Sequence, residues 1–145
     1  MTSTQLQFIE SFNALATEAH ETAVSKGWWE SEDANALHDI AGSGQLNQID
    51  REILDRIAAK LRNKNDGELL SLVHSEGSEV LEGLRHGNPP DDKIPDFSSA
   101  EAELADIIIR IFDWSKARGW RVAEALVAKM EMNKSRSVKH GGKLF

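Results

Sequence analysis

Apolar residues recur at intervals of three and four along most of the chain, which is the spacing of one face of an α-helix. The pattern stops where glycine and proline gather, and no stretch alternates convincingly with the period of two that a β-strand requires. We therefore expect an all-α protein, built as a bundle of four to five helices. The predicted helices span residues 4–26, 48–63, 67–86, 99–118 and 120–134.

The predicted helix boundaries carry residues that cap or break helices. Residues 31–47 include the breaker AGSG and are expected to form a loop, and residues 87–97 hold the three prolines. Ser98 followed by Glu101 matches a capping box for the next helix, while Asp66 is expected to cap the helix that begins after it. These signals divide the chain into helices joined by short connections.

The length of 145 residues predicts one domain spanning residues 1–145, because it supports a single substantial core. Cysteine is absent, which excludes a disulfide framework. The first residues show no basic region followed by an apolar run, and the longest apolar run, IIIRIF, is too short to span a bilayer. We expect a cytoplasmic protein that has no membrane partner.

The charge is unevenly distributed along the chain. A net charge of −7 argues against a nucleic-acid polymer as a partner, because phosphate backbones are held by basic surfaces. Residues 129–145 are basic, because they hold five lysines and arginines and only one acid. Residues 135–145 of this segment form a basic tail. A small basic pole suits a compact anion, and a solvated tail remains the alternative. The basic residues are Lys129, Lys134, Arg136, Lys139 and Lys143.

Two predicted helices place acids beside their apolar faces. Glu76 lies three residues after Val73 and four before Val80, inside an apolar arc, and Glu79 follows at its edge. An inward carboxylate is destabilising unless a positive group meets it. The arrangement therefore raises the question of what that positive group is.

The next predicted helix repeats the arrangement with Glu103 and Asp106, again three residues apart, bordering a wide apolar face. Antiparallel packing across the proline-containing loop would set this pair against Glu76 and Glu79. Four clustered carboxylates raise one another's pKa values, and oxygen-only ligands favour magnesium, or manganese in its place. The alternative is that these are ordinary surface acids. A di-iron centre is excluded, because no histidine has a glutamate three residues before it.

Three segments, HSEGSEVLEGLR, EAELADIIIRIFDW and KMEMNKSRSVKHGGKLF, resemble in order and spacing the MazG-like all-α nucleoside triphosphate pyrophosphohydrolases. The hallmark of that family is ExxE, a variable spacer and ExxD, matched here by Glu76 to Glu79 and by Glu103 to Asp106. The resemblance is good over residues 66–145 and weaker over 1–30. It is silent over 31–65, which we interpret as an extra loop and helix.

The resemblance implies a magnesium-dependent hydrolase that converts a nucleoside triphosphate, ribo- or deoxyribo-, into a monophosphate and pyrophosphate. Glu76, Glu79, Glu103 and Asp106 would be the catalytic metal ligands, and the role would be cleaning the nucleotide pool. It further implies a homodimer or homotetramer. A rival hypothesis is a non-catalytic helical module that acts as an interaction or regulatory partner.

The same resemblance implies a set of substrate-binding residues. The C-terminal pattern Lys-x-x-x-Asn-x-x-Arg binds triphosphate in the family, and Trp28 stands where related enzymes place an aromatic residue near the base. The residues leave open the alternative that Trp28 and Trp29 simply fill the core or an interface. The residues that match the C-terminal pattern are Lys129, Asn133 and Arg136.

Overall fold

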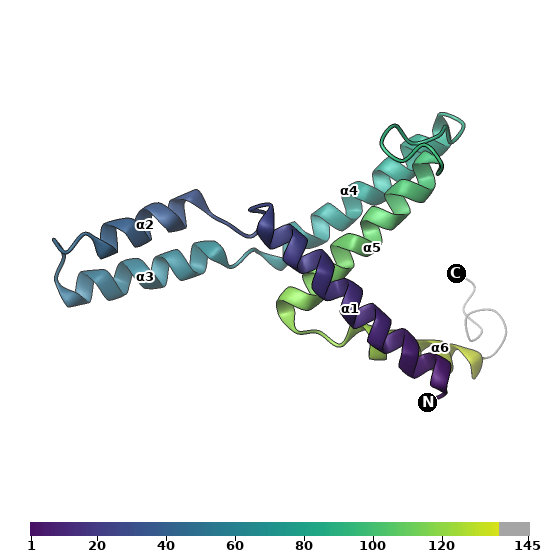
Figure 1. Cartoon of the computed structure of the whole chain (residues 1–145), viewed down its shortest axis with the longest axis horizontal. Coiled ribbons are helices and arrows are strands. Elements are labelled where there is room, and N and C mark those ends of the chain that lie inside the picture. Colours follow the sequence, from purple (N-terminus) through teal and green to yellow (C-terminus); the bar gives the residue numbers. More distant parts are fainter. Residues whose placement is uncertain (137–145) are drawn as a thin grey trace. The chain divides into compact units, whose positions relative to one another are not determined.

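The computed structural model describes residues 1–136, and its regular structure in that range is entirely helical. The expectation of an all-α chain is confirmed. Figure 1 shows the order of the elements along the chain. The helices are α1 (Ser3–Ser25), α2 (Glu32–Gly42), α3 (Gln48–Arg62), α4 (Asp66–Arg85), α5 (Ser99–Arg118) and α6 (Val122–Lys134).

Helix α2 corrects the prediction that residues 31–47 form a loop, and it brings the number of helices in residues 1–136 to six instead of four to five. The Ser31 side chain accepts a hydrogen bond from the Ala34 amide at 3.3 Å and so caps the helix. Ala34 and Ala41, two turns apart, are buried. A short helix that buries only alanine has a weak apolar pattern, and the glycines just after it obscured that pattern.

The starts of α4 and α5 are set by side-chain caps. Asn65, not Asp66 as expected, is the N-cap of α4, and its Oδ1 accepts from the Gly67 amide at 2.7 Å. The predicted capping box at α5 is confirmed, because the Ser98 amide donates to Glu101 Oε2 at 2.8 Å and the Glu101 amide donates to Ser98 Oγ at 3.4 Å. Both helices therefore begin with paired donors instead of unsatisfied ones.

The end of α5 shows why the chain turns at Gly119. Its φ of +64° lies in the left-handed region that glycine adopts without strain. The Trp120 amide donates to the Ser115 carbonyl at 2.9 Å and the Gly119 amide to Lys116 at 3.1 Å, the Schellman arrangement. The Trp120 ring then packs 5.2 Å from that of Trp114, centroid to centroid, which adds an apolar contact to the turn.

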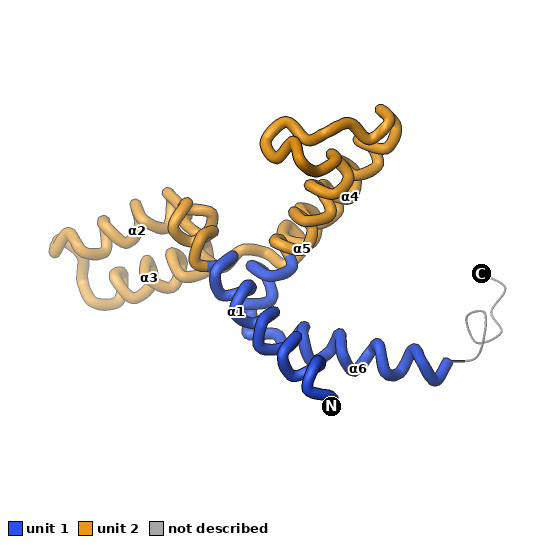
Figure 2. The backbone as a smooth tube through the Cα atoms, turned by 45° about the vertical axis from the view of Figure 1, so that its right-hand side comes forward, with its two compact units in different colours: residues 1–20, 111–145 blue, residues 21–110 orange. Residues whose placement is uncertain are grey.

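The chain forms two compact units, coloured separately in Figure 2. One unit comprises residues 1–20 and the residues from 111 onward, and the other comprises residues 21–110. Helices α1 and α5 each contribute to both units. The single domain over residues 1–145 stays a prediction.

Within the first unit, α1 packs against the second half of α5. The Phe12 and Phe112 rings meet edge to face with centroids 4.6 Å apart, and His20 Nδ1 lies 2.6 Å from Asp113 Oδ1. Ala16 of α1 is buried in the same unit. One apolar contact and one polar contact thus hold these two helices together.

Within the second unit, α4 and α5 run antiparallel, side by side in Figures 1 and 2. Their junction is tight, because a Cβ added at Gly83 would lie 2.6 Å from Ser99 Oγ. Asn88 in the connecting turn accepts at Oδ1 from the Ala100 amide at 2.9 Å. The proline-containing loop therefore brings the acidic segments of the two helices together. In the described part of the chain, no helix is both long enough and apolar enough to cross a membrane.

Candidate metal centre

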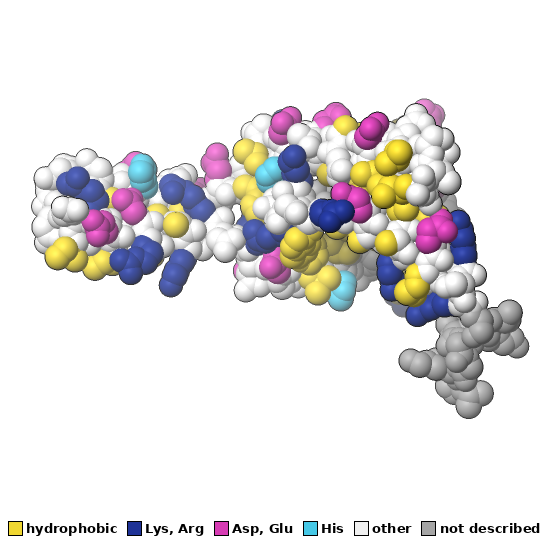
Figure 3. Space-filling view, turned by 90° about the horizontal axis from the view of Figure 1, so that it is seen from below, with side chains coloured by type: hydrophobic (Ala, Val, Ile, Leu, Met, Phe, Trp, Pro, Cys, Tyr) yellow, Lys and Arg dark blue, Asp and Glu magenta, His cyan; other side chains and the backbone are white. Residues whose placement is uncertain are grey.

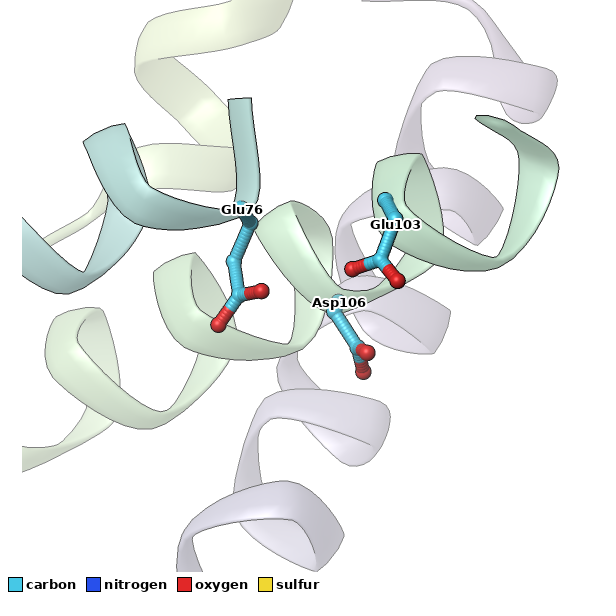
Figure 4. Close-up of side chains that lie close together, drawn as sticks. All are labelled: Glu76, Glu103 and Asp106. Carbon is cyan, nitrogen blue, oxygen red and sulfur yellow. The ribbon is translucent and has the colours of Figure 1, made fainter. Parts of the chain in front are cut away.

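Three of the predicted ligands come together between α4 and α5. Glu76 of α4 and Glu103 and Asp106 of α5 each offer one carboxylate oxygen, and these oxygens lie within 4.8 Å of one another. Figure 4 shows the three side chains, Glu76 on one helix and the other two on its neighbour. Glu76 is buried, with 6% of its surface exposed, Glu103 is half-buried and Asp106 is exposed. The cluster thus has one buried and one open side.

Glu79 lies next to this cluster without belonging to the three-oxygen group. Its side chain is exposed, and its Oε1 accepts a hydrogen bond from Ser75 Oγ at 3.4 Å. Its charge nevertheless acts on Glu103 more strongly than that of Asp106 or Glu76 does. The structure therefore places Glu79 as a close neighbour of the three acids.

Glu103 carries the clearest electrostatic sign of crowding. Burial raises the pKa of its carboxyl group, and the negative charges of Glu79, Asp106 and Glu76 raise it further. A carboxylate in this setting favours any positive species that neutralises it, either a proton or a cation. This is the behaviour expected of a ligand in an acidic cation site.

Arg110 is a site residue to which the sequence analysis assigned no role. Its Nε and Nη2 both donate to Glu76 Oε1, each at 2.9 Å, so the buried acid has an internal positive partner. The signal was present in the sequence, because Arg110 follows Asp106 by four residues and so shares its helix face. Both hydrogen bonds end on Oε1, and Oε2 of Glu76 therefore faces no competition from them.

Trp28 lies beside Arg110. The guanidinium carbon is 4.6 Å from the centroid of the Trp28 ring, a cation–π contact, and 48% of Trp28 is exposed. Trp28 therefore lies outside the core of the chain, and a place in an interface stays the alternative for it. Its neighbour Trp29 is half-buried and lies 5.4 Å from the Lys64 ammonium group. Trp28, Arg110 and Glu76 thus form a continuous chain of contacts in one unit.

The predicted triphosphate-binding residues belong to the other unit. Lys129 and Asn133 are one turn apart on α6, which puts them on one helix face, and Arg136 follows the end of that helix. All three side chains are exposed. Lys139, His140 and Lys143, together with most of the predicted basic tail, lie outside the described residues.

The donor set suits a small divalent cation. Magnesium takes oxygen ligands at about 2.1 Å, so opposite ligands of one ion stand about 4.2 Å apart, and it retains several waters. The oxygens of Glu76, Glu103 and Asp106 all lie within 4.8 Å of one another, which is close to that spacing. Three carboxylates of graded exposure therefore fit magnesium or manganese on both chemistry and distance.

Comparison of the chain with models of known protein families, with curated proteins and with solved structures finds no match.

Proposed function

We propose that the protein is a magnesium-dependent nucleoside triphosphate pyrophosphohydrolase that releases a monophosphate and pyrophosphate. The observation that carries the proposal is the cluster of Glu76, Glu103 and Asp106 with an exposed aromatic ring, Trp28, two contacts away. A cation site next to a stacking surface is what a nucleotide requires, because the phosphates need a metal and the base needs a flat apolar partner.

Each residue has a distinct role in this proposal. Glu76, Glu103 and Asp106 hold the cation, and Glu79 supplies a fourth carboxylate at the open side of the cluster. Arg110 orients Glu76 by donating to its Oε1. The bound cation neutralises phosphate charge and acidifies a water molecule. Trp28, held on one face by Arg110, offers its other face to the base.

The proposed role of the C-terminal residues rests on their match to the family pattern and on their chemistry. Lysine supplies a point charge and arginine a fork of donors for phosphate oxygens, which suits Lys129 and Arg136 to the triphosphate. Asn133 is one turn after Lys129 on the same helix face and adds an uncharged donor. In the proposal these three residues bind the pyrophosphate that leaves.

A non-catalytic module is the second candidate, and Arg110 is the observation that favours it. The two hydrogen bonds from Arg110 already give Glu76 a counter-charge without a metal ion. A chain that had lost its chemistry would keep such a pair, because removing one partner leaves a buried charge alone. The crowding around Glu103 argues the other way, because no described cation contacts that carboxylate.

The deciding experiment is a pyrophosphate-release assay with magnesium against a panel of ribo- and deoxyribonucleoside triphosphates. We expect equal amounts of monophosphate and pyrophosphate from at least one substrate. Glu103→Gln should lower kcat by a factor of about 100 or more, because it removes a ligand from the cation that organises the reaction. Glu79→Gln should have a smaller effect.

Glu82→Gln is the matched control for this assay. Glu82 lies on α4 nearly two turns beyond Glu76, but its carboxylate faces Arg85 at 3.8 Å and His86 at 3.4 Å. It should retain near wild-type turnover. If a folded protein loaded with magnesium hydrolyses no triphosphate of the panel, the second candidate replaces the first.

A further inference from the structure

The α2/α3 hairpin buries very little apolar surface in the second unit. Its buried residues are alanines: Ala34, Ala41 and Ala58, with at most 2% of their surface exposed. Five larger apolar side chains of the hairpin remain open to solvent, while Leu37 and Leu54 are half-buried. Figure 3 shows hydrophobic side chains lying on the surface of the hairpin beside Lys and Arg side chains. The five open side chains are Ile40 at 51% exposed, Ile49 at 70%, Ile53 at 43%, Ile57 at 42% and Leu61 at 46%.

Four of these side chains lie along one side of the hairpin, between its edge at Ile57 and its outer face at Ile49. Successive helical residues are about 100° apart, so Ile49, Ile53 and Ile57 follow one another in steps of about 40° along one side of α3. Ala58 marks the side that faces α2, and Ile57 is about 100° from it. On α2, Ile40 precedes the buried Ala41 as Ile57 precedes Ala58 on α3, so the side chains of Ile40 and Ile57 lie on the same side of the hairpin. We call this set, Ile40, Ile49, Ile53 and Ile57, the isoleucine edge.

The opposite edge of the hairpin is polar and already paired. Arg62 Nη2 donates to Asn35 Oδ1 at 3.2 Å, and His38 Nδ1 lies 3.5 Å from Asp55 Oδ1. These contacts link α2 to α3 directly. One edge of the hairpin therefore closes on itself, while the isoleucine edge has no described partner.

The charges along α3 select an occupant for the isoleucine edge. Beside the isoleucine edge, the acids Asp50 and Glu52 come before the midpoint of α3 and the basic residues Arg56 and Lys60 come after it. This edge of the helix is therefore complementary to itself when a second copy runs antiparallel. About the midpoint near residue 55, Ile53 then faces Ile57 of the second copy, and Asp50 faces its Lys60 at both ends. The remaining charged residues of α3 lie elsewhere on the helix, Asp55 and Arg62 at the opposite edge and Arg51 on the far side.

We propose that the isoleucine edge docks against the same edge of a second copy of the chain, with the two α3 helices antiparallel. An isologous contact of this kind covers the exposed isoleucines of both copies at once and closes as a two-fold dimer. It lies in residues 31–65 and is independent of the proposed hydrolase function. Any contact formed by other faces of the protein would be additional to it.

Cysteine cross-linking of the full chain tests the pairing directly, because the natural sequence contains no cysteine. Ile49→Cys and Lys60→Cys are made as separate variants and are then mixed under a mild oxidant. The antiparallel pairing predicts disulfide-linked dimers that are at least about tenfold more abundant in the mixture than in either variant alone. Within a single variant the two cysteines of the pair lie about 18 Å apart along the helices for Ile49→Cys and about 15 Å apart for Lys60→Cys, both too far for a disulfide.

Two outcomes of the cross-linking overturn the proposal. The first is the absence of dimers in the mixture when circular dichroism shows both variants to be folded. The second is equal cross-linking by each variant alone, which indicates parallel or random contact. Arg51→Cys mixed with Lys60→Cys is the matched control, because Arg51 lies on the far side of α3 from the isoleucine edge, and it should give no excess dimer.

Charge reversal gives a second, independent measurement. In sedimentation velocity, Asp50→Lys should weaken self-association about fivefold, and Asp50→Lys combined with Lys60→Asp should restore it. Ile53→Asp should weaken it about 100-fold or more, since a charge replaces an apolar contact in both copies. If Asp50→Lys and the double variant associate equally weakly, the antiparallel pairing is wrong and a partner of another kind covers this edge.

Discussion

Arg110 reaches across from α5 to the buried acid of α4, and both Nε and Nη2 donate to the same oxygen, Oε1 of Glu76, at 2.9 Å. The contact answers the question that an inward glutamate raises, because a positive group does meet it. It also shapes the proposed cation site, since it occupies one oxygen of Glu76 and leaves the other for a ligand. Arg110 therefore links the stability of the α4/α5 pair to the proposed cation site.

Arg110→Ala should lower the free energy of unfolding by about 3 kcal/mol in the absence of magnesium, because it leaves the buried Glu76 charge unpaired. Saturating magnesium should recover part of that loss, because the cation takes over the compensation. Urea denaturation with and without magnesium measures both effects. Arg85→Ala, which breaks an exposed ion pair with Glu82, is the control and should change stability little. An identical loss under both conditions would mean that no cation shares Glu76.

Magnesium at ten times its dissociation constant should raise the thermal midpoint of the wild-type chain by about 4 °C. Glu103→Gln and Asp106→Asn should each remove most of this response, because each deletes one ligand oxygen of the cluster. Glu82→Gln should keep it. The comparison requires only differential scanning fluorimetry, and an undiminished response in Glu103→Gln would show that the ion binds elsewhere.

The raised pKa of Glu103 predicts a pH dependence of stability. The folded state holds this proton more tightly than the unfolded chain does, so the stabilising contribution is complete below the unfolded pKa. It is lost as the pH rises through the raised folded pKa. Without magnesium, Glu103→Gln should therefore abolish this decrease, and it should melt at a higher temperature than wild type at pH 7.

Glu101 is the internal contrast for that titration. Hydrogen bonds from the Ser98 amide and hydroxyl lower its pKa, so its contribution is present above the unfolded pKa and is lost as the pH falls through the folded one. Glu101→Gln should reduce the loss of stability at acidic pH. It should leave unchanged the loss of stability that Glu103 causes as the pH rises. Melting temperatures between pH 3 and about pH 8 separate the effect of Glu101 from that of Glu103, since protein carboxyl groups titrate within that range. A profile in which both variants act in the same direction would contradict these assignments.

Trp28→Ala should raise KM for the preferred triphosphate by a factor of about 5 to 100, the range expected for one base–aromatic stack. Trp28→Phe should retain much of the affinity because it keeps an aromatic face. Trp29→Ala is the control, since that ring lies near Lys64 and is half-buried. Equal increases in KM for the Trp28 and Trp29 variants would point to a general structural effect instead of stacking.

Two glycines of α4 should respond oppositely to alanine. A Cβ at Gly77 meets nothing within 4 Å, so Gly77→Ala should stabilise the chain by about 0.5–1 kcal/mol through helix propensity. A Cβ at Gly83 would stand 2.6 Å from Ser99 Oγ and 3.1 Å from Ser99 Cβ, so Gly83→Ala should destabilise it by about 1–3 kcal/mol. Chemical denaturation measures both, and adding Ser99→Gly should relieve the Gly83 variant.

Local signals accounted for most of the secondary structure. The capping box of Ser98 and Glu101 and the break at Gly119 were readable because their hydrogen bonds join residues only a few positions apart. Helix α2 was missed because alanines carry its packing and a glycine-containing segment follows it. Its stability comes from α3, which a pattern within residues 31–47 does not record.

The sequence by itself determined that the chain is helical, and it identified the acids that lie on the margins of apolar faces, because both properties follow from the period of the helix. Only the tertiary structure decided which of those acids meet. It joined Glu76 to Glu103 and Asp106, left Glu79 at the side, and supplied Arg110 as the partner of Glu76. The reason is physical: such contacts depend on the rotation and offset of two packed helices, which local periodicity leaves undetermined.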